Sequence, residues 1–157
     1  MGASVRFDPA RLHHWLAYGF GSGLLPKAPG TWGTLAAVPL YLLLPPLSLP
    51  LYLAITVLAF AVGVWACGRV GEELGVHDHP AIVWDEVVGF FITMTAAPAG
   101  WPWLVAGFAL FRLFDIWKPW PIGPVDQRVK GGLGVMLDDV LAGLMALGVL
   151  QVAASII

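Results

Sequence analysis

The sequence predicts an all-α integral membrane protein, a bundle of about five membrane-embedded helices. Apolar residues make up 59% of the 157 positions and charged residues only 11%, whereas a soluble domain usually carries about 25% charged residues. The mean hydropathy is +0.81, and the apolar residues gather in stretches near the roughly 20 residues that a membrane-spanning helix needs. The length suits one domain, residues 1–157, and is too short for a second membrane unit.

Five apolar segments are expected to form these helices. The first is short for a span and is interrupted by Pro39. Ahead of it, the charged residues of positions 1–15 favour a short helix at the membrane interface. The Gly-rich stretch that follows them lacks the compact apolar core of a cleaved signal peptide. The expected segments are 31–44, 49–67, 81–97, 101–117 and 135–157.

The turns between these segments alternate in charge, and the alternation predicts their orientation. The turns at 45–48 and 98–100 carry no charge, whereas 69–79 and 118–130 are rich in it. If the uncharged turns share one side of the membrane, the basic residues outside the segments share the other, which the positive-inside rule assigns to the cytoplasm. These residues are Arg6, Arg11, Lys27, Arg69, Lys118, Arg128 and Lys130.

Carboxylates inside or at the rim of the apolar segments mark the expected site. A carboxylate near hydrocarbon is costly unless it is paired, protonated or bound to a cation. The predicted topology brings all of them to the cytoplasmic edge, where we expect them to bind Mg²⁺, a cation that prefers oxygen ligands. The alternative is that they cap helix N-termini and face water. They are Asp85, Glu86, Asp115, Asp138 and Asp139.

Adjacent residues of a helix point about 100° apart, which limits what the two acidic pairs can do. We therefore expect Asp85 and Glu86 to divide their roles between a metal and a hydrogen-bond donor. The same holds for Asp138 and Asp139. Glycines within the apolar segments suit close helix packing, and these are Gly63, Gly89, Gly107, Gly143 and Gly148.

Basic and hydroxyl side chains near the acids are candidates for phosphate binding. Arg112 and Lys118 lie three residues on either side of Asp115, so they form either a phosphate clamp or ion pairs that ease the burial of the acid. Thr31 and Thr34 open the first apolar segment, with Lys27 nearby. That helix start either directs N–H groups at an anion or is simply a flexible bend into the bilayer.

A loop motif, His77-Asp78-His79, precedes the Asp85 segment. Asp78 or His79 is the candidate for proton transfer to a leaving oxygen, and a solvated loop is the alternative. The net charge of -2 offers no basic stripe, so no nucleic-acid partner is expected. The lone Cys67 lies in an apolar run and is expected to be an inert buried thiol.

Four blocks of the chain resemble the phosphatidylglycerophosphatase A family: 30–35, 76–86, 111–122 and 131–139. They occur in the same order and at fitting separations, and the resemblance covers nearly the whole chain. It implies an Mg²⁺-dependent phosphatase of the bacterial inner membrane. Such an enzyme removes the terminal phosphate of phosphatidylglycerophosphate, a membrane phospholipid, and yields phosphatidylglycerol.

Our hypothesis is that Asp85, Glu86, Asp115, Asp138 and Asp139 surround one or two Mg²⁺ ions, with Asp85 also serving in the chemistry. Direct attack by water and a phosphoaspartyl intermediate both stay open. The alternative class is a small transporter in which the buried carboxylates form a cation or proton pathway. A pathway would need polar residues through the whole bilayer, and the outer halves of the segments contain no charge.

Overall fold

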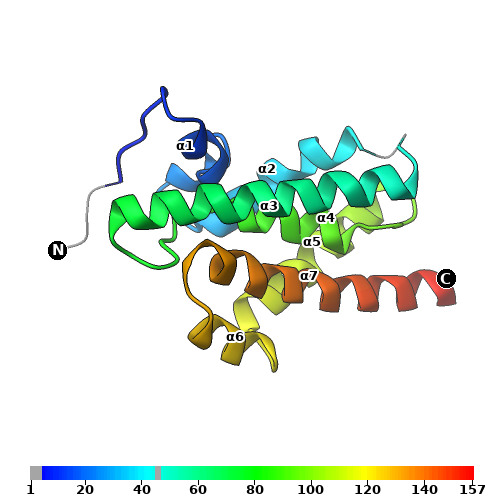
Figure 1. Ribbon diagram of the computed structural model, residues 1–157. Coiled ribbons are helices and arrows are strands. Elements are labelled where there is room, and N and C mark those ends of the chain that lie inside the picture. The colour runs from blue at the N-terminus through cyan, green and yellow to red at the C-terminus, as the bar shows by residue number, and fades with distance from the viewer. Residues whose placement is uncertain (1–4, 45–46) are drawn as a thin grey trace.

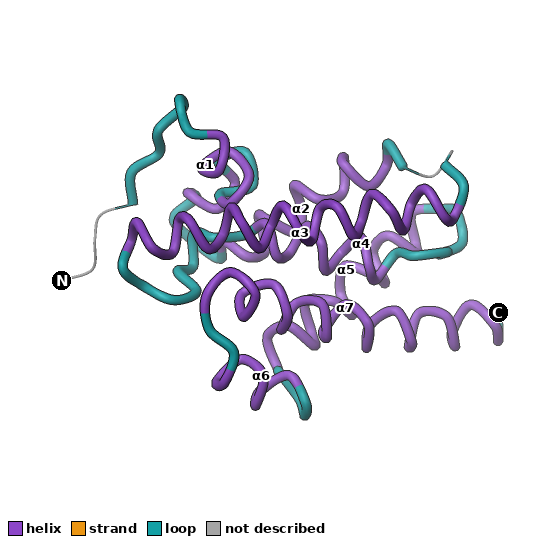
Figure 2. The backbone as a smooth tube through the Cα atoms, viewed as in Figure 1, coloured by secondary structure: helices purple, strands orange, loops and turns teal. Residues whose placement is uncertain are grey.

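The computed structural model describes residues 5–44 and 47–157, and within them the protein is entirely helical, which confirms the all-α prediction there (Figures 1 and 2). The predicted turn at Pro45 and Pro46 lies outside the described residues. The elements are α1 (Leu12–Ala17), the 3₁₀ turn η1 (Ser22–Leu24), α2 (Pro29–Leu42), α3 (Leu49–Leu74), α4 (Trp84–Thr93), α5 (Trp101–Trp117), α6 (Ile122–Arg128) and α7 (Gly131–Ile156).

Two of these helices, α3 and α7, are long and apolar enough to cross a membrane. Each has 26 residues, and their most apolar windows have mean hydropathies of 2.1 and 1.9. At 1.5 Å per residue, 26 residues extend about 39 Å, more than the roughly 30 Å hydrocarbon core of a bilayer. They run side by side in opposite directions (Figure 1). Together they indicate a membrane-associated protein, while embedding of the other segments stays a prediction.

The segment expected at 81–97 is shorter in the structure than predicted. Its helix, α4, covers only Trp84–Thr93, ten residues, or about 15 Å of rise. Every residue from Trp84 to Phe91 is buried, because α2, α3, α5 and α7 all pack around this helix. The apolar residues of this helix therefore face other helices of the protein. Composition alone does not distinguish such a helix from one that faces lipid.

Two further boundaries differ from the prediction, and one helix was not predicted. Helix α3 continues to Leu74 and ends at Gly75, which adopts the left-handed conformation that glycine favours (φ 65°). Helix α7 begins at Gly131, ahead of position 135. The short helix α6 was not anticipated, whereas α1 confirms a short N-terminal helix, packed on α3.

Close approaches between helices occur at glycines. A Cβ on Gly143 would lie 2.6 Å from the carbonyl oxygen of Gly89, so α4 and α7 touch backbone to backbone there. A Cβ on Gly132 would overlap the carbonyl oxygen of Val64, which brings the start of α7 against α3. The expectation for Gly148 was wrong, because a Cβ at that position would meet nothing within 4 Å.

The helices gather their polar ends at one end of the bundle. Helices α2, α4 and α7 start there, and α3 and α5 end there (Figure 2). As a result, carboxylates from well-separated parts of the sequence come together, as the alternation of charged and uncharged turns predicted.

Candidate active site

A cavity of about 280 Å³ opens at this end of the bundle. Its walls come from the start of α2, the loop before α4, the first turn of α4, the end of α5 and the start of α7. The lining residues are Pro29, Gly30, Asp78, His79, Pro80, Ile82, Asp85, Glu86, Arg112, Asp115, Lys118, Asp138 and Asp139.

Three buried carboxylates, which we call the acid triad, line this cavity. One oxygen each from Asp85, Glu86 and Asp139 lies within 4.8 Å of the others, and these residues are only 5%, 7% and 1% exposed. Asp85 Oδ1, Glu86 Oε2 and Asp139 Oδ2 are buried without a hydrogen-bond partner among the described residues. Buried carboxylates this close together repel one another when they are ionised. A bound cation or protonation would therefore stabilise the triad.

Asp85 and Glu86 converge on this one place, although we expected them to divide their roles. Both lie in the first turn of α4, and Asp139 approaches that turn from α7. The pair on α7 does divide: Asp139 joins the triad, while Asp138 bonds to Lys118. The packing of α4 against α7 therefore brings both acids of the α4 pair, but only Asp139 of the α7 pair, to one place.

The remaining predicted metal ligands, Asp115 and Asp138, are paired with basic side chains. Arg112 Nη1 bonds to Asp115 Oδ2 and lies 3.7 Å from Glu86 Oε1. Lys118 Nζ lies 2.8 Å from Asp138 Oδ2 and 3.9 Å from Asp115 Oδ1. Burial alone would lower the pKa of Lys118, but the hydrogen bond to Asp138 and the surrounding carboxylates raise it above its ordinary value. Lys118 thus stays charged beside the cavity.

A second group of acids stands next to the triad, and one of its members was not predicted. Oxygens of Asp78, Asp126 and Asp138 lie within 4.8 Å of one another. Asp126 belongs to α6, and its sequence context is an ordinary polar turn that carries no signal for this position. Burial raises the pKa of Asp78 above its ordinary value, against the opposing effect of Lys118. Asp78 therefore retains a proton more readily than a solvated aspartate.

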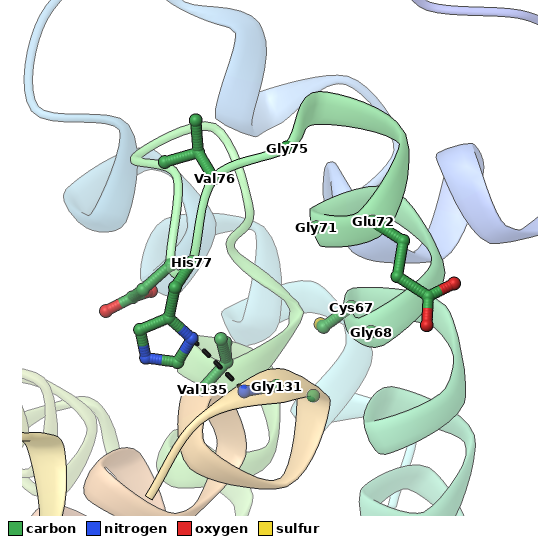
Figure 3. Close-up of a pocket in the computed structure, with 11 residues that line it drawn as sticks. Cys67, Gly68, Gly71, Glu72, Gly75, Val76, His77, Gly131 and Val135 are labelled. Carbon is green, nitrogen blue, oxygen red and sulfur yellow. Dashed lines mark hydrogen bonds between the residues drawn. The ribbon is translucent and has the colours of Figure 1, made fainter. Parts of the chain in front are cut away.

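The two histidines of the loop motif point in different directions. His79 lines the cavity, and its Nδ1 accepts the backbone N–H of Ala81 at 3.1 Å, while its Nε2 has no hydrogen-bond partner within the described part of the chain. His77 lies outside the cavity, and its Nδ1 accepts the backbone N–H of Gly131 at 3.3 Å (Figure 3). His77 thus ties the loop to the start of α7, beside a neighbouring hollow of about 260 Å³.

The predicted phosphate ligands of the α2 region are not among the residues that line the cavity. Lys27 is exposed, and the buried Thr34 donates its hydroxyl to the carbonyl oxygen of Gly30 at 2.9 Å. Thr31 is half-buried and also lies outside the lining. Gly30 does line it, and a Cβ there would lie 2.8 Å from Glu86 Oε1 and 3.0 Å from Arg112 Nη1. The backbone of α2, rather than its side chains, closes this wall.

Comparison with known proteins places this site in a family. A family model described as phosphatidylglycerophosphatase A matches residues 15–154, which include every residue of the cavity lining. The chain belongs to the phosphatidylglycerophosphatase A family. It is therefore a phosphatase that acts on a phosphate monoester, and membership argues against the transporter alternative.

Two relatives show how far the similarity to this family extends. The phosphatidylglycerophosphatase A of Escherichia coli (strain K12) is 49% identical over 149 residues, which are 94% of this chain and 87% of the relative. That of Haemophilus influenzae (strain ATCC 51907 / DSM 11121 / KW20 / Rd) is 50% identical over 135 residues, 85% of this chain and 83% of the relative. No solved structure matches the chain.

Proposed function

We propose that the protein is an Mg²⁺-dependent phosphatase that hydrolyses phosphatidylglycerophosphate to phosphatidylglycerol and inorganic phosphate. The observation that carries the proposal is the acid triad: three buried carboxylates with unpartnered oxygens, open to a cavity that also contains Arg112 and Lys118. An anionic substrate would not approach such a group unless a cation offset its charge.

The donor set of the triad fits Mg²⁺. Asp85, Glu86 and Asp139 offer only oxygen atoms, the ligands that Mg²⁺ takes, and the cavity leaves room for the waters it retains. Bound there, the ion would polarise the phosphoryl group and lower the pKa of a bound water. Asp115 and Asp138 stand next to the triad and could complete the shell, although each is already paired with a basic side chain.

The basic side chains would bind the phosphoryl oxygens. Arg112 lines the cavity, and its buried Nε has no hydrogen-bond partner among the described residues, so the guanidinium retains a donor that a bound phosphate would satisfy. Lys118, held charged by its carboxylate neighbours, would supply a second positive group. Phosphate contacts from the α2 region stay a prediction. Lys27, Thr31 and Thr34 lie outside the present lining of the cavity and would have to approach a bound phosphate from there.

Proton transfer would fall to Asp78 or His79, both at the wall of the cavity. The raised pKa of Asp78 suits a group that donates a proton to the leaving glycerol oxygen. His79 offers a free Nε2 for the same task. Attack by water on phosphorus and attack by a triad carboxylate remain the two routes, and ¹⁸O transfer from labelled water, with trapping of any phosphoenzyme, separates them.

The family and the site support a particular substrate and location. The two relatives described above carry the name of an enzyme acting on phosphatidylglycerophosphate. A lipid with a terminal phosphate presents its charge at the membrane interface, where the polar end of the bundle would meet it. The positive-inside rule supports a cytoplasmic site and N-terminus in a multi-pass protein of the bacterial inner membrane.

The deciding experiment is phosphate release by the purified protein in detergent. Phosphatidylglycerophosphate should yield inorganic phosphate with Mg²⁺ and none with EDTA, and Mg²⁺ should restore release after chelation. Phosphatidate serves as a second lipid monoester that tests the headgroup requirement. Release that is unchanged in EDTA would contradict the proposed metal, and no release from phosphatidylglycerophosphate in Mg²⁺ would contradict the proposed substrate.

A further inference from the structure

The N-terminal segment, residues 5–25, folds over the loop that leads into α4, and we call it the N-terminal bracket. Its helix α1 has only six residues, too few to be stable by itself in water. Tertiary contacts must therefore hold the bracket in place. Most of the contacts of α1 are with α3.

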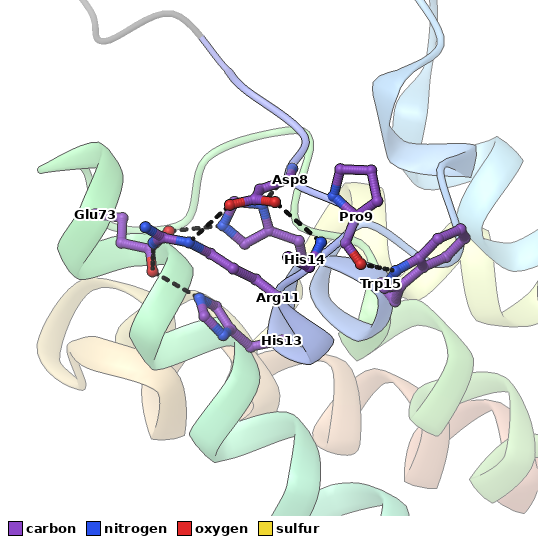
Figure 4. Close-up of polar contacts among 8 residues, drawn as sticks. Asp8, Pro9, Arg11, His13, His14, Trp15 and Glu73 are labelled. Carbon is purple, nitrogen blue, oxygen red and sulfur yellow. Dashed lines mark hydrogen bonds and ion pairs between the residues drawn. The ribbon is translucent and has the colours of Figure 1, made fainter.

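One carboxylate at the end of α3 collects these contacts. Glu73 Oε1 accepts Arg11 Nη1 at 2.9 Å and lies 2.6 Å from His13 Nε2, and Glu73 Oε2 lies 2.7 Å from His14 Nε2 (Figure 4). Arg11 Nε also bonds to Asp8 at 3.1 Å. Glu73 thus contacts three residues of the bracket, Arg11, His13 and His14.

The hydrogen bonds around His14 show what kind of contact this is. The backbone N–H of Asp8 donates to His14 Nδ1 at 3.0 Å, so the ring proton of a neutral His14 belongs on Nε2, where it points at Glu73. A metal ion at Nε2 would need an unprotonated Nε2 with its lone pair available, and would prefer the ring proton on Nδ1. The cluster of His13, His14 and Glu73 is therefore a hydrogen-bonded anchor and not a metal site.

The other end of the bracket holds the residues that start α4. The backbone N–H of Val83 donates to the carbonyl oxygen of Ala17 at 2.8 Å, and a Cβ on Gly23 would overlap the carbonyl oxygen of Ala81. The bracket therefore touches the 81–83 backbone directly. Val83 is the N-cap of α4, so this contact fixes where the helix begins.

The first turn of α4 requires a restraint on its position because it places Asp85 and Glu86 close to Asp139, which has the same charge. Repulsion within the acid triad pushes this turn away from α7 whenever no cation is bound. The Trp84 ring offers one restraint, since its Nε1 donates to the carbonyl oxygen of Ala59 at 3.0 Å. The bracket restrains the backbone itself, one residue before that turn.

We propose that Glu73 is a positioning residue: by anchoring the N-terminal bracket, it holds Asp85 and Glu86 close enough to Asp139 for the three carboxylates to bind one cation. The inference deepens the proposed function and rests on it for the identity of the cation. It assigns Glu73 no contact with substrate. The chain offers a matched control in Glu72, an exposed carboxylate on the same helix turn.

The test compares Glu73→Gln with Glu72→Gln in the full-length protein in detergent. Amide hydrogen exchange of residues 81–90 should become about tenfold faster in Glu73→Gln, the scale expected when hydrogen bonds to a charged group are lost. Mn²⁺, used as a spectroscopic stand-in for Mg²⁺, should bind about tenfold more weakly by electron paramagnetic resonance, as for other supporting residues of metal sites. Glu72→Gln should match the wild type in both.

Other variants and outcomes keep the proposal open to refutation. Arg11→Gln removes one partner from the bracket side and should shift both measurements in the same direction by less. Equal exchange and equal Mn²⁺ binding in the two glutamate variants would overturn the proposal, as would faster exchange spread evenly over α3 and α7, which would mark a general loss of stability. If both shifts occur while the wild type releases no phosphate from phosphatidylglycerophosphate, the proposed function fails and the positioning role stands.

Discussion

At the scale of single residues, the acid triad places three negative groups closer together than their charges favour. Asp115 and Asp138 have basic neighbours, but the triad has unpartnered oxygens. A fold keeps an arrangement that costs free energy where function requires it, and the cost should be measurable when a charge is removed.

Asp139→Asn should have opposite effects on activity and stability. The variant loses a proposed ligand, so phosphate release should fall by more than about 100-fold, beyond the usual cost of altering a supporting residue. It also removes repulsion within the triad, so the apparent unfolding temperature in EDTA should rise. Glu72→Gln serves as the exposed control. Retention of more than about a tenth of the activity would contradict the role of Asp139.

The raised pKa of Asp78 predicts a pH-dependent difference in stability. Its folded state binds the proton more tightly than the unfolded chain does, so its contribution is fully present below about pH 4 and is lost as the pH rises through the raised pKa. Asp78→Asn should therefore gain stability relative to the wild type as the pH increases. Unfolding temperatures at about pH 5 and about pH 8 test this, and a gain that shrinks toward alkaline pH would contradict it.

At the scale of helices, the crossing of α4 and α7 sets the geometry of the triad. The two backbones meet at Gly89 and Gly143, and Gly89 also lies against the carbonyl of Asp139. Since Glu86 and Asp139 lie within one turn of this contact, any widening of the crossing would separate the carboxylates as well.

Gly143→Ala should separate the helices, whereas Gly148→Ala should not. A Cβ at Gly143 meets the backbone of Gly89, which cannot move aside, and the expected loss is about 1–3 kcal/mol of stability together with activity. Gly148 lies on the same helix with open space around it, so alanine there should add about 0.5–1 kcal/mol and leave activity unchanged. Unfolding temperature and phosphate release measure both, and equal behaviour of the two variants would refute the role of the crossing.

At the scale of the whole molecule, the antiparallel order of the helices separates a polar end from an apolar end. The loop between α3 and α4, which contains Val76, belongs to the polar end with the cavity, while the turn between α4 and α5, which contains Ala99, lies at the opposite end (Figure 1). The lysine and arginine residues gather at the polar end together with the carboxylates, and the positive-inside rule, which counts only lysine and arginine, favours that end on the cytoplasmic side.

Single cysteines at these two ends should react from opposite sides of the membrane. Cys67 is buried, so the natural sequence provides an unreactive background. An impermeant maleimide should label Ala99→Cys in spheroplasts and label Val76→Cys only after the membrane is opened. Labelling of both variants from one side would contradict the predicted multi-pass orientation.

Much of this organisation was accessible from the sequence, for identifiable reasons. The helical class follows from apolar composition, and the meeting of Asp85, Asp115 and Asp138 at one end follows from the alternation of charged and uncharged turns. The extent of α4 did not follow, since hydropathy treats burial in protein and in lipid alike. Asp126 did not follow either, because α6 brings it to Asp78 through a loop geometry that no periodic pattern records.

The sequence by itself determined which residues cost free energy to bury. Carboxylates and basic groups next to apolar segments indicate a polar site, however the helices pack. Only the tertiary structure decided which of them remain unpaired. Pairing depends on distances between side chains. Arg112 and Lys118 bond to Asp115 and Asp138, and Arg112 also lies 3.7 Å from Glu86, whereas one oxygen each of Asp85, Glu86 and Asp139 has no hydrogen-bond partner among the described residues. The sequence therefore determined which residue types make up the site, and the fold determined which of their charges are balanced by a neighbour.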